Sequence, residues 1–379
     1  MLTALPVSSE QRLQQIALAR QAVLHGGKSQ PGMLAEPWIE RSWQRCLASG
    51  KKPEQTVGFD ILPPQILRRT EEANQVLAAA ARPVLEKLGA AIASTRYFAI
   101  LTNAQGVVVD VNGAIDRRDR RVDLITRIGV DLSEDSVGTT AIGAALTELQ
   151  PVWLHRGEHF FNANSAYSCA GAPLFGPDGR CAGMLDLTGV DTVERPELKH
   201  LVVQSARSIE NALIQNRPHD LMIRLNWSSQ SLGDDMDGMV CLDPDGWVTG
   251  ANPAARQMVP ALQNAGAAAV HCSELFAMPY EMLFDAAKSN PLSYPQAIDV
   301  PLWSGLRLHA LPLLRGRAPA AGRLGGRGTP VPTLQLKDIE TALIRKAVSD
   351  ARGNIVKAAR ALGISRATVY RRLGERPTK

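Results

Sequence analysis

The stretch AARALGISRATVYRRL, residues 358–373, has the pattern of two short helices joined by a tight turn. Small side chains such as Ala358 allow a second helix to approach closely. Gly363 suits the turn, because a positive φ costs little only for glycine. Ser365 can cap the second helix, on which Val369 and Leu373 form an apolar face. These residues predict a helix-turn-helix.

The exposed face of the second helix has the chemistry of a DNA reader. Side chains at the N-terminus of such a helix reach base edges in the major groove, and basic ones hold phosphates. Arg366 stands early on the helix, where an arginine can make a bidentate contact to guanine O6 and N7. The other outward side chains are Thr368, Tyr370, Arg371 and Arg372. We therefore expect double-stranded DNA as a partner.

The distribution of charge supports this interpretation. Residues 333–379 hold eleven Lys or Arg against four Asp or Glu, and residues 312–332 add four arginines and no acid. The whole chain has a formal net charge of +5, which leaves residues 1–311 at −6. A compact basic tail on a larger acidic body is expected when one module binds nucleic acid.

Two segments lead into this tail. Residues 334–351 have apolar side chains on one helical face and predict a further helix. Residues 315–332 (RGRAPAAGRLGGRGTPVP) are rich in Gly, Pro, Ala and Arg and cannot bury a core, which predicts a flexible linker.

The larger part of the chain alternates helical and strand patterns. Residues 64–94 have apolar side chains at helical spacing, with Pro83 predicting a kink or an interruption. Two hairpins are indicated by turn residues between short apolar runs, the first over 97–112 and the second over 170–187. A short helix over 138–149, a strand over 151–154 and a long helix over 197–216 complete an α+β sensor fold.

A smaller cycle runs over 234–314. Strands at 238–242 and 247–250 flank Asp243-Pro-Asp-Gly, a strong turn sequence, and late strands follow in 297–314. The whole segment 234–314 is similar to a PAS domain, mainly through Asp243-Pro-Asp-Gly and Ala251-Asn-Pro-Ala-Ala. A structural or dimerising role is favoured over a second ligand site because no convergent polar cluster is evident.

The tail closely resembles the Fis-type domain of bacterial enhancer-binding proteins. The resemblance implies Arg366 as the principal base reader and dimerisation through the helix at 334–351, with Ile339, Leu343 and Ile344 at the interface. The residues it places at or near the phosphates are Asn354, Lys357, Ser365, Thr368, Tyr370, Arg371 and Arg372.

The sensor part resembles the GAF domain of the acetoin-catabolism regulator family. The resemblance rests on SVGTTAIGAAL (136–146), EHF (158–160), Cys169, CAGMLDLTG (181–189) and the upstream RSWQRCLASG (41–50). Thr140 departs from the family's usual Asn, which puts the ligand chemistry in doubt. The resemblance implies a small ketone, aldehyde, alcohol or diol as effector. The candidate effector-binding residues are Trp153, His155, His159, Phe160, Phe161, Tyr167 and Cys169.

The expected organisation follows from these segments. It comprises a helical leader (1–60), a GAF sensor domain (61–217), a PAS-like domain (234–314), a flexible linker (315–332) and an all-α Fis-type helix-turn-helix domain (333–379).

Several kinds of chemistry are not expected. His155, Glu158 and His159 match H-x-x-E-H, but Gly157 and a preceding strand disfavour the helix that this zinc motif needs, so we expect no metal. No cofactor and no enzyme activity are expected. The five widely spaced cysteines, the absence of a signal-peptide pattern and the absence of a long apolar run predict a cytoplasmic protein without membrane contact.

The sequence also bears on how the protein works. Relatives of this layout carry an ATPase domain between sensor and tail, and no G-x-x-x-x-G-K-[ST] occurs in this chain. We therefore expect a dimeric, effector-sensing transcription regulator that does not open sigma-54 promoters alone. RNA polymerase or a full-length sigma-54 activator is a possible partner. The alternatives are an architectural or repressor protein whose sensor only dimerises, and a redox sensor using Cys169 and Cys181, brought together across their hairpin.

Overall fold

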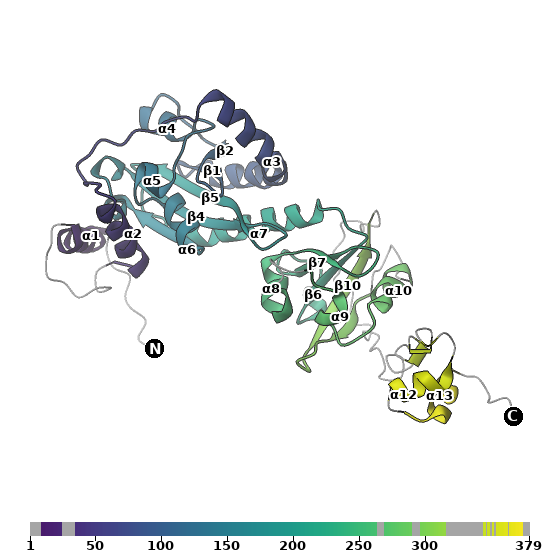
Figure 1. Ribbon diagram of the computed structural model, residues 1–379. Helices are drawn as coiled ribbons and strands as arrows, with labels where there is room; N and C mark the ends of the chain where they lie inside the picture. The colour runs from purple at the N-terminus through teal and green to yellow at the C-terminus, as the bar shows by residue number, and fades with distance from the viewer. Residues whose placement is uncertain are drawn as a thin grey trace. The chain divides into compact units, whose positions relative to one another are not determined.

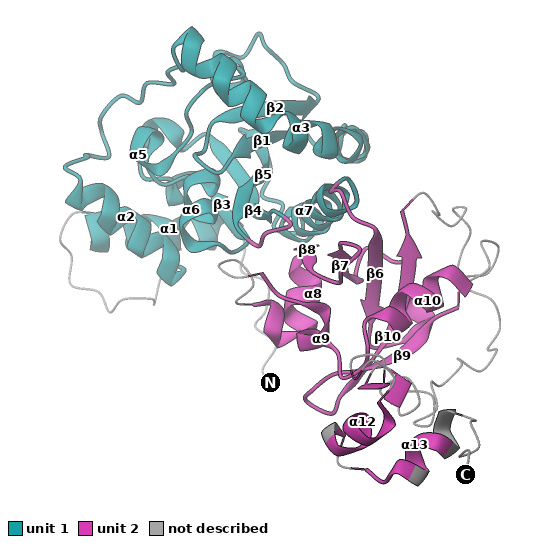
Figure 2. Ribbon diagram, turned by 45° about the vertical axis from the view of Figure 1, so that its right-hand side comes forward, with its two compact units in different colours: residues 1–176, 180–216 teal, residues 177–179, 217–379 magenta. Residues whose placement is uncertain are grey.

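The computed structural model divides into two compact units (Figure 2). Unit 1 comprises residues 1–176 and 180–216, and unit 2 comprises residues 177–179 and 217–379. The residues that the structure describes are 9–24, 35–263, 269–289, 296–315, 344–345, 347–348, 351, 354–362 and 364–373, of which 9, 361, 367 and 371–373 are described by their backbone alone.

Unit 1 is built on a five-stranded antiparallel sheet with the order β2-β1-β5-β4-β3 (Figure 1). Its strands are β1 (Tyr97–Asn103), β2 (Val108–Gly113), β3 (Val152–His155), β4 (Tyr167–Phe175) and β5 (Cys181–Val190). Both predicted hairpins are present, since β1 pairs with β2 and β4 pairs with β5. The two hairpins form one sheet, because β5 also pairs with β1.

Helices cover both faces of this sheet. They are α1 (Ser9–Leu24), α2 (Pro37–Ala48), α3 (Pro64–Ile92), α4 (Arg120–Ile125), α5 (Glu134–Val137), α6 (Ala141–Glu148) and α7 (Leu198–Gln215). The long helices α3 and α7 pack against each other and against one face, in a core that includes Leu185 and Leu187 of β5. A second core on the opposite face joins α2, α4, α5 and α6 to the sheet and includes Ile100 of β1.

The central strands are apolar because both of their faces are covered. Every residue of β1 is buried, and Phe98 and Ile100 belong to one core while Tyr97 and Ala99 belong to the other. Successive side chains of a strand point to opposite faces, so a strand buried on both faces needs a continuous apolar run rather than alternation.

The helix α3 passes through Pro83 without interruption, so of the two expectations, a kink or an interruption, the interruption is wrong. Proline in a helix interior removes one backbone hydrogen bond and costs about 3 kcal/mol. Buried side chains on both sides of Pro83, including Leu77, Ala81, Leu85 and Leu88, hold the helix against the sheet. Their burial offsets the loss.

Unit 2 contains a second five-stranded antiparallel sheet, with the order β8-β7-β6-β10-β9. The strands are β6 (Leu221–Asn226), β7 (Gly238–Leu242), β8 (Val248–Ala251), β9 (Ile298–Pro301) and β10 (Arg307–Leu314). The helices α8 (Pro253–Met258), α9 (Cys272–Leu275) and α10 (Glu281–Ser289) pack on it in a single core.

The two sheets share one spatial plan with different chain orders. In unit 1 the central strand β5 follows the hairpin β1–β2, whereas in unit 2 the central strand β6 precedes the hairpin β7–β8. The second sheet is therefore a circular permutation of the first. Sequence reasoning missed β6, which lies before the segment 234–314 that was expected to form the smaller domain.

The C-terminal part holds the predicted helix-turn-helix in α12 (Ile355–Ala361) and α13 (Arg366–Leu373). Ala359 and Val369 are buried with Ile344 in a small core of their own. Most of the expected helix at 334–351 and the whole of the turn residue Gly363 lie outside the described residues.

The α+β fold class is confirmed, with two antiparallel sheets and an all-helical C-terminal part. Within the described residues, no helix is long and apolar enough to span a membrane.

Truncating the core side chain of α3 should destabilise unit 1. Leu85 is 1% exposed, and we expect Leu85→Ala to lower the free energy of unfolding by about 2–5 kcal/mol, because a cavity replaces its packing against the sheet. Urea unfolding followed by tryptophan fluorescence measures the change. Val76→Ala on the same helix is the control, since Val76 is 66% exposed and should change stability by no more than about 0.5 kcal/mol. Equal losses in the two variants would contradict the packing described for α3.

Candidate functional site

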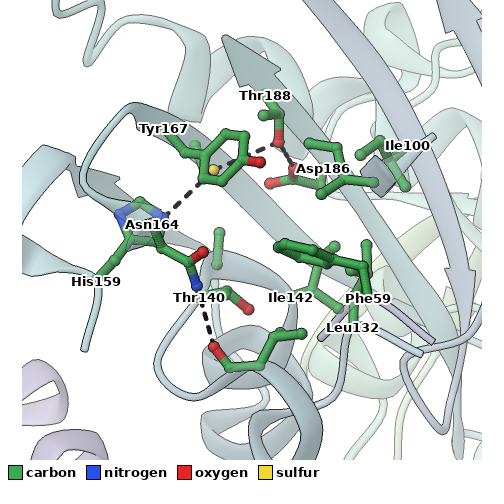
Figure 3. Close-up of a pocket in the computed structure, with 14 residues that line it drawn as sticks. Phe59, Ile100, Leu132, Thr140, Ile142, His159, Asn164, Tyr167, Asp186 and Thr188 are labelled. Atoms are coloured by element: carbon green, nitrogen blue, oxygen red, sulfur yellow. Dashed lines mark hydrogen bonds between the residues drawn. The ribbon is translucent and has the colours of Figure 1, made fainter. Parts of the chain in front are cut away.

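Unit 1 contains a cavity between its sheet and the layer formed by α4, α5, α6 and the loops that follow β3 (Figure 3). The space not filled by atoms is about 350 Å³, part of it open to solvent. Its wall is mainly apolar. The lining residues are Phe59, Ile100, Ile125, Leu132, Val137, Thr140, Ala141, Ile142, His159, Asn164, Tyr167, Cys169, Asp186 and Thr188.

The strand β5 supplies the polar centre of the cavity. Asp186 and Thr188 lie two residues apart, so both side chains point to the face opposite Leu185 and Leu187. In the sheet, Asp186 stands between Ile100 of β1 and Gly171 of β4. The register of three strands therefore places this carboxyl in the middle of the sheet.

Asp186 is a buried acid without a described cationic partner. Its side chain is 1% exposed, and the Thr188 hydroxyl donates a hydrogen bond to its Oδ2 atom. Burial disfavours the charged form and raises the pKa of Asp186 to about 7, while the Thr188 hydrogen bond opposes that rise. Its Oδ1 atom has no hydrogen-bond partner among the residues that the structure describes.

Three of the seven predicted effector residues line the cavity, namely His159, Tyr167 and Cys169. Burial lowers the pKa of His159 to about 4, so the imidazole is neutral at physiological pH. His159 Nε2 lies 3.6 Å from Cys169 Sγ, and burial raises the pKa of that thiol well above its ordinary value. The Tyr167 hydroxyl donates to the carbonyl oxygen of Arg121 at 3.1 Å, and burial raises its pKa as well.

The other four predicted residues do not line the cavity. Trp153 and His155 stack with ring centroids 6.5 Å apart, and His155 Nδ1 lies 2.8 Å from the hydroxyl of Ser168. Phe160 and Phe161 pack edge to face in the core of this face. The Phe161 ring packs closely on Gly138. That residue has a φ of 69°, and a Cβ atom there would lie 2.7 Å from the ring, so the position favours glycine.

The residues of the H-x-x-E-H pattern, His155, Glu158 and His159, make packing contacts, hydrogen bonds and an ion pair within unit 1. Glu158 is 1% exposed, accepts a hydrogen bond from the backbone N–H of His155 and forms an ion pair with Arg12 of α1. Burial raises the pKa of Glu158 to about 7, and Arg12 opposes that rise. The His159 Nδ1 atom lies 2.9 Å from the carbonyl oxygen of Arg156. These groups are engaged with different partners and do not converge on one point.

The structure corrects the idea that Cys169 and Cys181 lie near each other. In the β4–β5 ladder Cys169 is opposite Thr188, whereas Cys181 is opposite Phe175. The positions of Cys181 and Thr188 are seven residues apart on β5, or roughly 23 Å at about 3.3 Å per residue. Burial raises the pKa of both thiols. A disulfide between them is excluded by this register.

Sequence reasoning missed most of the polar lining, above all Asp186, Thr188 and Asn164. The signal for the first two is the segment MLDLT, in which polar residues at every second position interrupt an apolar strand. Asn164 ends the 3-10 helix Asn162–Asn164 and carries no such signal. Thr140, noted as a departure from the family pattern, also lines the cavity and caps α6, accepting from the N–H of Gly143 at 3.2 Å.

The predicted DNA-binding residues in the described part of the tail lie on or next to α12 and α13. Lys357 and Arg366 are exposed, and Thr368 and Tyr370 are half-buried. Asn354 and Ser365 act as N-caps, accepting hydrogen bonds from the N–H groups of Lys357 and Thr368 at 3.1 Å each. The side chains of Arg371 and Arg372 lie outside the described residues.

The prediction of Ile344 as a dimer-interface residue is wrong for the described chain. Its side chain is 1% exposed and packs against Ala359 and Val369 within the same helix-turn-helix. Val348, one helical turn later, contacts the same core. Ile339 and Leu343 lie outside the described residues.

Two family models match the chain. The model described as "MimR, N-terminal domain" matches residues 14–211, which is more than half of the chain and contains the cavity. The model described as "Bacterial regulatory protein, Fis family" matches residues 335–375, which contain α12 and α13.

The chain is similar to curated proteins named as regulators of transcription or catabolism. It is 30% identical over 259 residues to the acetoin catabolism regulatory protein of Cupriavidus necator, covering 65% of this chain and 37% of that protein. It is 30% identical to the acetoin dehydrogenase operon transcriptional activator AcoR of Bacillus subtilis, covering 46% and 29%. It is also 30% identical to the propane 2-monooxygenase operon transcriptional activator MimR of Mycolicibacterium goodii, covering 52% and 32%. The chain thus spans about a third of the length of these relatives.

Replacing Asp186 by asparagine should reduce the pH dependence of stability. The folded pKa of about 7 lies above the ordinary 3.8, so the folded state binds the extra proton between these values, and wild-type stability falls as pH rises toward 7. As pH rises from 5 to 8, this carboxyl should lower the free energy of unfolding of the wild type by about 2–3 kcal/mol. The asparagine variant should not show this decrease, because its side chain does not titrate. Urea unfolding of both proteins at the two pH values measures the difference.

The comparison needs a control because other groups titrate in the same range. Burial also raises the pKa of Glu158 and of Glu210 to about 7, and both remain in every variant, so their contributions cancel. Asp135→Asn, changed at an exposed carboxyl, should keep the wild-type pH dependence. An Asp186→Asn protein with that same dependence would show that Asp186 is not the buried acid described.

Proposed function

The chain belongs to the family defined by the MimR N-terminal domain, and from that premise we propose that it is a DNA-binding transcription regulator controlled by a small organic effector. The observation that carries the proposal is the presence, in one chain, of a mainly apolar cavity in unit 1 and a Fis-type helix-turn-helix with exposed basic side chains. A cavity of this kind, apolar with a few polar groups, suits a small ligand.

The DNA-binding surface of the proposal is the exposed side of α12 and α13. Arg366 lies at the first position of α13, where a recognition helix contacts base edges, and we assign it the reading of a guanine. Lys357 and Tyr370 would position the helix through phosphates, together with Arg371 and Arg372. Asn354 and Ser365 cap the helices and would lie beside the backbone of the DNA, as would Thr368.

The effector would bind in the cavity of unit 1. A small ketone, aldehyde, alcohol or diol suits a mainly apolar cavity with a few polar groups, and His159, Tyr167 and Cys169 stay neutral in it because burial disfavours the charged form of each. Two of the relatives carry the word acetoin in their names, which is consistent with a small oxygenated compound. Trp153, His155, Phe160 and Phe161 would support the cavity from outside.

A dimer would couple the effector to DNA. Two copies of the tail would bind half-sites about one helical turn apart, roughly 34 Å, and the effector would act by favouring one arrangement of the two sensors. RNA polymerase or a full-length sigma-54 activator would be the partner at the promoter. Activation and repression are both compatible with this scheme.

Arg366→Ala should lower affinity for the specific operator by about 1–3 kcal/mol, or roughly 5- to 150-fold, because it removes a bidentate contact to a base. The variant should also tolerate changes at one base pair that the wild-type protein rejects. Fluorescence anisotropy with operator duplexes carrying single base-pair changes measures both effects.

Arg360→Ala is the matched control, because Arg360 is exposed on α12 and is not assigned to a base. It removes the same charge and should weaken specific and random DNA by a similar, smaller factor. If Arg366→Ala also weakened all sequences alike, Arg366 would be a phosphate contact. If neither variant changed binding, the tail would not be the DNA-binding surface.

A further inference from the structure

The cavity of unit 1 presents two buried oxygen atoms that accept no hydrogen bond from any described residue. They are Oδ1 of Asp186 and Oδ1 of Asn164. Both side chains are 1% exposed, and both line the same cavity (Figure 3). Buried polar atoms are nearly always paired, so two orphaned acceptors at one cavity point to a ligand rather than to packing.

The orientation of each side chain is fixed by its other polar atom. The Thr188 hydroxyl donates to Oδ2 of Asp186. The Asn164 Nδ2 atom donates to the carbonyl oxygen of Val137 at 3.2 Å, and this carbonyl can only accept. The amide of Asn164 is therefore placed with its oxygen, not its nitrogen, free to bind a ligand.

The hydroxyl and ring groups around the cavity already have partners. The Thr188 hydroxyl donates a hydrogen bond to Asp186, and the Tyr167 hydroxyl donates one to the carbonyl oxygen of Arg121. His159 and Cys169 contact each other, and Thr140 caps α6. The lining set contains no Lys or Arg among the residues that the structure describes. Among the described lining residues, Asp186 Oδ1 and Asn164 Oδ1 are thus the buried oxygens that still lack a donor.

A ligand must therefore bring donors of its own. Above its pKa of about 7 the Asp186 carboxylate can only accept, so a ketone or aldehyde, which also offers only acceptors, would leave both oxygens unpaired, and this costs affinity. A diol offers two hydroxyl donors on a short apolar frame and matches both the oxygens and the apolar wall.

We propose that the effector is a small neutral diol, with one hydroxyl donating to Asp186 and the other to Asn164. This assignment rests on the proposed effector function of the cavity and narrows it from four compound classes to one. Asp186 and Asn164 are then the residues that determine specificity, and neither belongs to the predicted effector set.

The protonation of Asp186 gives the proposal a second signature. A hydroxyl donor favours the carboxylate over the acid, so diol affinity should rise as pH passes upward through the Asp186 pKa of about 7. The titratable groups that face Asp186 across the cavity are His159, Tyr167 and Cys169, whose shifted pKa values keep them uncharged over this range. Glu158, next to His159 in the chain, titrates near 7 and remains unchanged in the Asp186 variant.

Isothermal titration calorimetry of the full chain with matched four-carbon probes tests the proposal. The probes are butane-2,3-diol, butan-2-ol, butanone and 3-aminobutan-2-ol, which vary the number of donors and the charge on nearly the same frame. We expect the diol to bind at least about tenfold more tightly than butan-2-ol and butanone, and more tightly at pH 8 than at pH 6.

Two substitutions and one control assign the preference to residues. Asp186→Asn and Asn164→Leu keep the approximate shape of each side chain, and each should remove most of the preference for the diol. Asp186→Asn should also abolish its pH dependence. Asp110→Asn, changed at a buried carboxyl of β2 that pairs with Arg82 and does not line the cavity, should bind like the wild type. Circular dichroism checks that each variant is folded.

The outcomes separate this inference from the proposed function. Equal binding of diol and butanone, or tighter binding of the amine, would overturn the diol assignment while leaving the cavity as an effector site. A diol preference that survives both substitutions would also overturn it. If no probe bound the wild-type protein, both the diol assignment and the effector role of the cavity would fail, whereas DNA binding would be judged separately by the Arg366 variant.

Discussion

The burial of β5 on both faces is the constraint on which unit 1 depends. This strand lies between β1 and β4 and must satisfy two cores at once, so its residues alternate between them. Leu185 and Leu187 hold α3 and α7, and the residues between them face the other layer. The hydrogen bond from Thr188 to one oxygen of Asp186 offsets part of the cost of burying that carboxyl, and the raised pKa reflects the remaining cost.

The sequence predicted the parts of the fold that depend on local signals. Both hairpins of unit 1 follow from turn residues between apolar runs, and α7 from periodicity over 197–216. An interruption at Pro83 was expected because the local cost of proline is visible in the sequence, whereas the packing that outweighs it comes from a sheet formed later in the chain. Local rules fail where tertiary burial is large.

The site was harder to predict than the fold. Aromatic, histidine and cysteine side chains within residues 153–169 suggested a cavity there, and three of the seven line it. The other wall depends on strand register, which places Asp186 beside Ile100 and Gly171. No short motif encodes that pairing. Ile344 shows the same limit in the tail, because an apolar helix face can serve an intramolecular core or a dimer equally well.

The permuted order of the second sheet has a consequence for how the chain emerges during synthesis. In unit 1 the central strand β5 is synthesised last. Until it is available, β1 and β4 each have one unpaired side, the side that faces the middle of the finished sheet. In unit 2 the central strand β6 is made first, and each later hairpin can add to a strand that is already present. A fragment starting at residue 234 would lack that template and expose two open strand edges, which favours aggregation. A fragment made to contain the second unit alone must therefore include the six residues Leu221–Asn226.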